Sequence, residues 1–183
     1  QAIVRIPWRE RWEAELQPGP INEYFEVIDI DPSSGQLYDP IDLNDPHVLA
    51  QDGLPPSEGD PRFHQQMVFA VAMKTVKVFE RALGRKVYWS PRWDKESHCY
   101  VEVPRLRIYP HALREANAYY SSQKKALLFG YFKASMTDPG VNLPGGWVFT
   151  ALSHDIIAHE TTHAILDGLH RRYSEATSAD SLA

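Results

Sequence analysis

The residues best suited to chemistry form one short run, His-Glu-Thr-Thr-His, at positions 159–163. Residues four apart on a helix lie on one face, one turn apart, so His159 and His163 can bind a single metal ion. Glu160 is rotated by about a quarter turn from His159, which places its carboxylate beside the open position of the metal. There it can take a proton from metal-bound water and return it to a leaving amine. This HExxH spacing predicts zinc-assisted hydrolysis, with His159 and His163 as metal ligands and Glu160 as the catalytic base.

The residues around this run predict a long, strongly apolar helix over about 150–171. Ile156, Ile157, Ile165 and Leu166 flank the motif on both sides. Two histidines and a glutamate are costly to bury in such a helix unless each is paired or bound to a metal. The alternative interpretation is a pair of histidines hydrogen-bonded in a polar seam, without a metal.

Two aspartates extend the same helix face in both directions. Asp155 lies four residues before His159, in the first turn, where the helix dipole alone would favour it. Asp167 lies four residues after His163 and could orient a ligand imidazole through its second ring nitrogen, or simply bond locally. Spacing alone makes neither aspartate a zinc ligand.

A second long helix is predicted over 61–83. Asp60 is a suitable N-cap, Pro61 suits the first helical position, and Gly84 stands just past the end. Apolar residues recur along the segment at the spacing of a broad helical stripe.

Strand signals fill the segment between the two helices. Strands 117–120 and 126–132 are predicted as a hairpin, because the polar run 121–125 separates them. A further strand is expected over 99–109, where Pro104 makes it an edge strand or a bent one.

Weaker patterns predict four shorter features. Residues 86–89 are expected to form a short strand, and residues 111–116 one or two helical turns. A strand over 24–30 is predicted from alternating aromatic and β-branched residues. Residues 137–146 are rich in glycine and proline and are expected to form a loop.

These patterns together predict an α+β fold. We expect a twisted, mainly antiparallel sheet whose edge strand, at 117–120, lies beside the metal-motif helix. Residues 1–60 are interpreted as an extended N-terminal segment packed on the domain, because they contain few periodic apolar stretches. Residues 61–183 are interpreted as the catalytic domain.

Composition narrows the possible partners. A net charge of -5 argues against a nucleic-acid partner, since the basic residues occur only in short pairs. No apolar run approaches the roughly 18 residues of a membrane-spanning helix. Cys99 is the only cysteine, so no intrachain disulfide is possible. Most of the other histidines, which include His64 and His111, are expected to be surface or capping residues. Lys124 and Lys125 are expected to be solvated in a turn. No signal peptide follows Gln1, and the compartment stays unassigned.

Around the HExxH motif, the sequence resembles the thermolysin-like zinc endopeptidases, a gluzincin group of the zincin fold. Residues 155–167 resemble the active-site helix of that family, including the alanine after the second histidine and the aspartates at both ends. The run that begins Asn117-Ala118 resembles its substrate-binding edge strand, which holds a peptide main chain by strand addition. The resemblance implies a thermolysin N-terminal-domain-like fold, a Zn²⁺ cofactor and peptide or protein substrates. It also makes Asp155 a candidate ligand for Ca²⁺.

The sequence departs from the family at the third zinc ligand. The family uses a glutamate about twenty residues after the second histidine, which reaches Ala183. The later acidic residues Asp167, Glu175 and Asp180 do not match that position. The resemblance therefore implies a third ligand just past Ala183 and a missing C-terminal helical domain. We expect these 183 residues to be an N-terminal fragment that is inactive alone.

Three alternatives stay open. A zinc aminopeptidase would share the helix motif, but no glycine-methionine-glutamate-asparagine stretch for a free amine precedes it. Glu175 or Asp180 could fold back as a third ligand and complete a minimal metallohydrolase. A non-catalytic binding module on a degenerate zincin fold is the third alternative, although such a module would not require the glutamate base.

Overall fold

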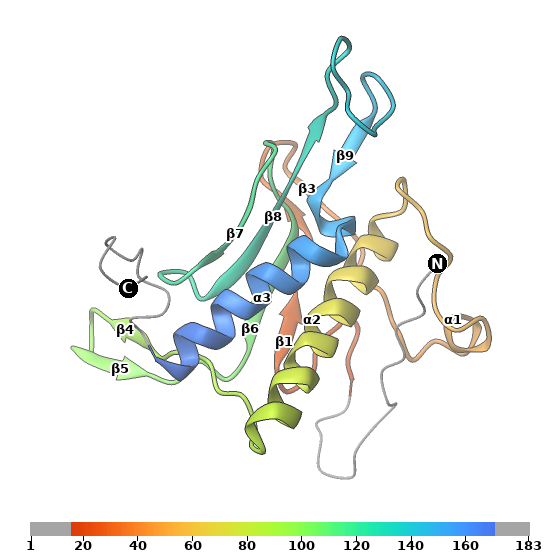
Figure 1. Cartoon of the computed structure of the whole chain (residues 1–183). Coiled ribbons are helices and arrows are strands. Elements are labelled where there is room, and N and C mark those ends of the chain that lie inside the picture. Colours follow the sequence, from red (N-terminus) through yellow and green to blue (C-terminus); the bar gives the residue numbers. More distant parts are fainter. Residues whose placement is uncertain (1–15, 171–183) are drawn as a thin grey trace.

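The structure is a computed structural model that describes residues 16–170 of the chain. It is an α+β fold in which two long helices lie side by side on one face of a twisted sheet (Figure 1). These helices are α2 (Pro61–Leu83) and α3 (His154–Leu169). Helix α2 packs on β1 (Phe25–Val27) and β6 (Leu106–Leu113), and α3 packs on β7 (Ala118–Ser121) and β8 (Ala126–Lys133).

The main sheet has the order β1-β6-β8-β7, and β9 (Trp147–Phe149) pairs with the C-terminal end of β8. The β1–β6 and β6–β8 pairs are parallel, whereas β7–β8 and β8–β9 are antiparallel. The prediction of a mainly antiparallel sheet is therefore wrong at its centre, and the sheet is mixed. The reason lies in burial: the first five residues of β8 are buried and suit an interior position, whereas β7 is half-buried or exposed and suits an edge. The chain reverses between β6 and β7 and again between β7 and β8, so β6 and β8 run in the same direction and pair as parallel neighbours.

Helix α2 has the caps that its sequence predicts. The Asp60 side chain accepts a hydrogen bond from the Arg62 amide, and Pro61 opens the helix. Gly84 ends it with φ 66°, the left-handed conformation that glycine adopts without steric cost. Its fully buried Val68 and Val76 belong to the hydrophobic core between helices and sheet.

The other described elements are short. They are β2 (Ile30–Asp31), β3 (Gln36–Leu37), α1 (Pro46–Ala50), β4 (Arg92–Asp94), β5 (Cys99–Val101) and the 3₁₀ turn η1 (Thr150–Leu152). The predicted strand over 24–30 is divided between β1 and β2, and the segment that contains Ile41 continues over the core, where Ile41 is buried. The parts of the predicted N-terminal segment and of the catalytic domain at 1–15 and 171–183 lie outside the described residues.

The structure corrects three further predictions, one of them only in part. Residues 86–89 form no strand, although Val87 and Trp89 are buried. The expected strand over 99–109 is two strands, because the chain leaves β5 before Pro104 and enters β6 after it. Residues 111–113 belong to β6 and not to a helical turn, since His111 is buried on the sheet.

Candidate metal centre

The two histidines of the motif meet on one face of α3. His159 Nε2 and His163 Nε2 lie 3.0 Å apart, and the two ring centroids are 4.6 Å apart. Zinc–nitrogen bonds of about 2.0–2.1 Å in a tetrahedral site place two ligand nitrogens about 3.3 Å apart. A shift of a few tenths of an ångström would let both nitrogens bind one ion. His159 is exposed and His163 half-buried, so an ion can reach them from solvent.

Helix α3 presents these imidazoles because its opposite face is fixed in the core. Ile157, Thr161 and Ile165 are fully buried there. The Thr161 hydroxyl donates to the Ile157 carbonyl at 2.7 Å, which satisfies a polar group in an apolar environment. At the N-terminus the Ser153 side chain accepts a hydrogen bond from the Ile156 amide. The helix is therefore buried on one side only, and the metal motif occupies the other.

Glu160 is held by the edge strand of the sheet. Its Oε2 accepts a hydrogen bond from the Tyr120 backbone amide at 3.0 Å. Oε1 has no hydrogen-bond partner among residues 16–170. A carboxylate with one oxygen anchored and the other available can accept a proton from a neighbouring group.

Asp167 takes part in a buried network that sequence reasoning missed. Its Oδ2 accepts hydrogen bonds from Tyr120 Oη and from Lys125 Nζ, each at 2.7 Å. Burial, followed by the bond to Asp167, raises the pKa of Tyr120 well above its ordinary value. The expectation of a solvated Lys125 is wrong, because its side chain is only 9% exposed and pairs with Asp167. The sequence feature that could have predicted this network is Asp167 itself, since a carboxylate on an apolar helix requires a partner.

The predicted substrate-binding residues lie where β7 begins. Asn117 is exposed, and its Oδ1 accepts a hydrogen bond from the Ala118 amide at 2.9 Å. Ala118 opens β7 and pairs with Phe129 of β8, so β7 is the edge strand that the sequence predicts. A Cβ atom at Gly130 would lie 2.5 Å from the Asn117 carbonyl oxygen. Glycine at that position lets the start of β7 approach β8 closely.

Asp155, the calcium candidate, lies at the N-terminus of α3. Its carboxylate is fully exposed, with His154 Nδ1 3.5 Å away. Within residues 16–170 no group of three or more histidine, cysteine, aspartate or glutamate side chains is arranged to hold a metal ion. Among the described residues, the candidate metal centre thus consists of two imidazoles.

No protein-family model, curated protein or solved structure matches the chain. Among the residues that the structure describes, no helix is both long and apolar enough to span a membrane.

A second histidine pair lies in the core, apart from the metal motif. His111 Nδ1 is 2.6 Å from Asp29 Oδ1, and His111 Nε2 is 2.8 Å from His64 Nδ1. Both histidines are buried, so the expectation of surface or capping positions is wrong for these two residues. Burial, followed by the neighbouring His111, lowers the pKa of His64 to about 4. The partners are far apart in sequence, so local spacing carries no signal for this network.

Proposed function

We propose that this protein is a zinc-dependent endopeptidase, in which His159 and His163 bind Zn²⁺ and Glu160 is the catalytic base. The observation that carries the proposal is the 3.0 Å separation of the two Nε2 atoms. It is supported by the neighbouring glutamate, which the edge strand holds in place. The thermolysin-like resemblance of residues 155–167 agrees with this assignment.

Each residue then has a defined task. A bound Zn²⁺ lowers the pKa of its water to about 7 and polarises the scissile carbonyl. Glu160 accepts a proton from the attacking water and delivers it to the leaving amine. Asn117 and Ala118 bind the main chain of an extended peptide at the start of the edge strand. Peptide and protein substrates are therefore expected.

Two imidazoles do not complete a catalytic zinc site, which uses three protein ligands. The proposal includes a third ligand, a carboxylate, from outside residues 16–170. Two imidazoles alone hold zinc weakly and leave more than one position open. With these two imidazoles as its only protein ligands, a zinc ion would support peptide hydrolysis slowly or not at all.

Zinc titration of the purified chain tests the metal assignment. We expect one weakly bound equivalent by calorimetry, and a loss of about 100-fold or more in affinity in His159→Ala and in His163→Ala. The matched control is His154→Ala, which removes an exposed histidine from the same helix and should leave affinity unchanged. If all three variants bind alike, the motif is not the metal site.

Activity measurements test the enzyme assignment separately. Tight binding of one zinc equivalent together with casein cleavage would show that the third ligand lies within the 183 residues, and tight binding without cleavage would contradict the enzyme assignment. An aminopeptidase, in contrast, would cleave only peptides whose amino terminus is free. Peptides with blocked ends distinguish the two reactions.

A further inference from the structure

A basic hollow lies at the opposite end of the sheet from the β8–β9 hairpin. It has a volume of about 250 Å³ and lies where the start of β6, the β7–β8 turn and the base of the β4–β5 hairpin meet. The basic side chains that line it are Arg92, Arg105, Arg107, Lys124 and Lys125. These residues come from three separate parts of the sequence, where they occur only singly or in pairs.

The hollow is positive although the chain is negative. Besides the basic side chains, two carboxylates, Glu26 and Glu102, line it. Lys125 is paired with the buried Asp167, so four basic groups face two acidic ones. The local excess of two positive charges contrasts with a net charge of -5 for the whole chain. Such a concentration of one sign raises the local concentration of a small ion of the opposite sign.

Two of the guanidinium groups are anchored by the backbone. Arg105 Nε donates to the Asn22 carbonyl at 2.7 Å, and Arg107 Nη2 donates to the Lys124 carbonyl at 3.0 Å. A guanidinium carries five N–H donors, so each group keeps further donors for a ligand. Anchoring reduces the side-chain entropy that an arginine loses when it binds.

The turn that carries the two lysines is also constrained. Lys125 has φ 49°, in the left-handed region that non-glycine residues rarely occupy. Its buried ion pair with Asp167 holds it there and fixes the turn beside the hollow. Strain of this kind persists where the surrounding structure over-determines a conformation.

We propose that this hollow binds a small, multiply charged oxyanion such as a phosphate group. The forked donors of arginine match two oxygens of a phosphate or carboxylate at once. The volume is below the roughly 300–1,000 Å³ of pockets that take drug-sized ligands, so a small anion fits better than a large organic molecule. The hollow shares no residue with the metal motif, and anion binding there is a property beyond the proposed hydrolysis.

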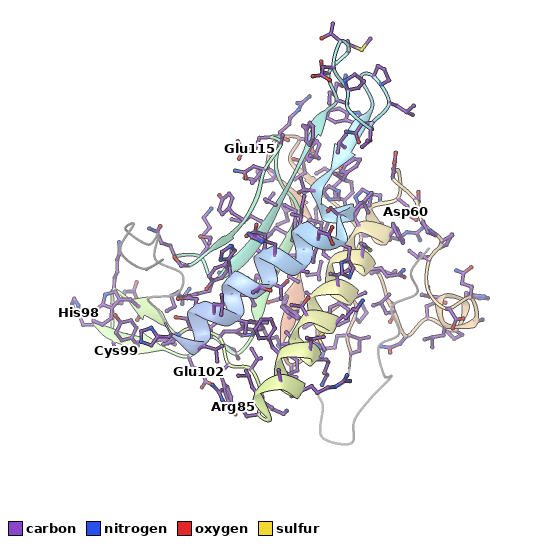
Figure 2. All side chains as sticks on the ribbon, viewed as in Figure 1. Asp60, Arg85, His98, Cys99, Glu102 and Glu115 are labelled. Carbon is purple, nitrogen blue, oxygen red and sulfur yellow. The ribbon has the colours of Figure 1, made fainter. Side chains whose placement is uncertain are left out.

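Inorganic phosphate is the probe for this site. We expect the 183-residue chain to bind one equivalent in a saturable manner, measured by amide chemical shifts at constant ionic strength. Arg107→Gln and Lys124→Gln should each weaken binding by about tenfold. Glu102→Gln removes a repelling carboxylate at the base of the β4–β5 hairpin (Figure 2) and should tighten it.

Arg85→Gln is the matched control. Arg85 also donates to a backbone carbonyl, that of Lys86, but it lies just past the end of α2 and does not line the hollow (Figure 2). Its loss removes the same charge and should leave phosphate affinity unchanged. Lys124 is exposed in a turn, so Lys124→Gln tests the site even if Arg107→Gln fails to fold. Shifts that do not saturate, or equal losses in Arg85→Gln and Lys124→Gln, would overturn the proposal.

Discussion

Tyr120 connects the edge strand to two turns of the metal-motif helix. Its amide donates to Glu160 and its hydroxyl donates to Asp167, seven residues further along α3. A free glutamate side chain has several rotamers, and fixing one costs about 1.5–2 kcal/mol. The hydrogen bond from Tyr120 fixes the Glu160 rotamer when the protein folds. A ligand that binds beside Glu160 would therefore not have to order its carboxylate. Orientation of Glu160 is therefore a property of the residue pair, not of the motif alone.

Glu160→Gln tests the role of the carboxylate. In the zinc-loaded protein that carries the third ligand, we expect peptide hydrolysis to fall by about 100-fold or more, because an amide cannot accept the proton. Zinc affinity should be retained, since the imidazoles are untouched. The glutamine oxygen can still accept the bond from the Tyr120 amide, so the fold should persist. Unchanged hydrolysis would exclude Glu160 as the base.

The ends of α3 determine how the metal motif lies against the sheet. Ser153 caps its start, and near its other end Gly168 passes directly over the backbone of residues 88–90. A Cβ atom built at Gly168 would lie 2.0 Å from the Tyr88 carbonyl oxygen, far below a normal contact. Val87 and Trp89 are buried although residues 86–89 form no strand, and α3 packs directly on the backbone of this segment.

Gly168→Ala should therefore destabilise the protein even though alanine is the better helix former. The clash involves backbone atoms, which have little room to move, and overpacking of this kind costs about 1–3 kcal/mol. It outweighs the gain of about 0.5–1 kcal/mol that alanine provides within a helix. Urea unfolding measures the difference. Gly59→Ala is the control, because nothing lies within 4 Å of a Cβ atom there; equal stability of the two variants would contradict the packing argument.

At the scale of the whole molecule, features with local signals were predictable and features set by distant partners were not. The bounds of α2 follow from Asp60 and Gly84, and the structure confirms them. The β7–β8 hairpin follows from its polar turn and is also confirmed. The parallel pairing of β6 with β8 depends on which strand is buried on both sides, which spacing does not reveal. The geometry of His159 and His163 is likewise local, whereas the partners of Glu160 and Asp167 come from β7 and its turn.

The buried histidine network makes the stability of the whole fold depend on pH. His64 has a pKa of about 4 in the folded protein, against an ordinary value of 6.5. The unfolded chain binds the proton first as pH falls, so the free energy of unfolding decreases between pH 6.5 and 4. The contribution of this residue is about 3 kcal/mol over that window. Burial would raise the pKa of Asp31, but hydrogen bonds to its carboxylate hold that pKa well below its ordinary value. The stabilisation that the ionised Asp31 provides is therefore lost only at lower pH.

Thermal unfolding at pH 7, 5.5 and 4.5 measures this dependence. The melting temperature should fall as the buffer becomes more acidic. It should fall less in His64→Gln, because glutamine has no group that takes up a proton in this pH range. His154→Gln removes an exposed histidine and should follow the parent chain. An identical pH profile for His64→Gln and the parent would show that the dependence arises elsewhere.

The open face of α3 has a consequence for the identity of the metal. Two solvent-facing imidazoles one turn apart accept Cu²⁺ and Ni²⁺ as well as Zn²⁺, and by the Irving–Williams order copper binds most tightly. The geometry of the described residues contains no feature that rejects these ions. If the motif binds zinc as we propose, selection of zinc over these ions would have to come from a further ligand and from the metal supply that the protein meets as it folds.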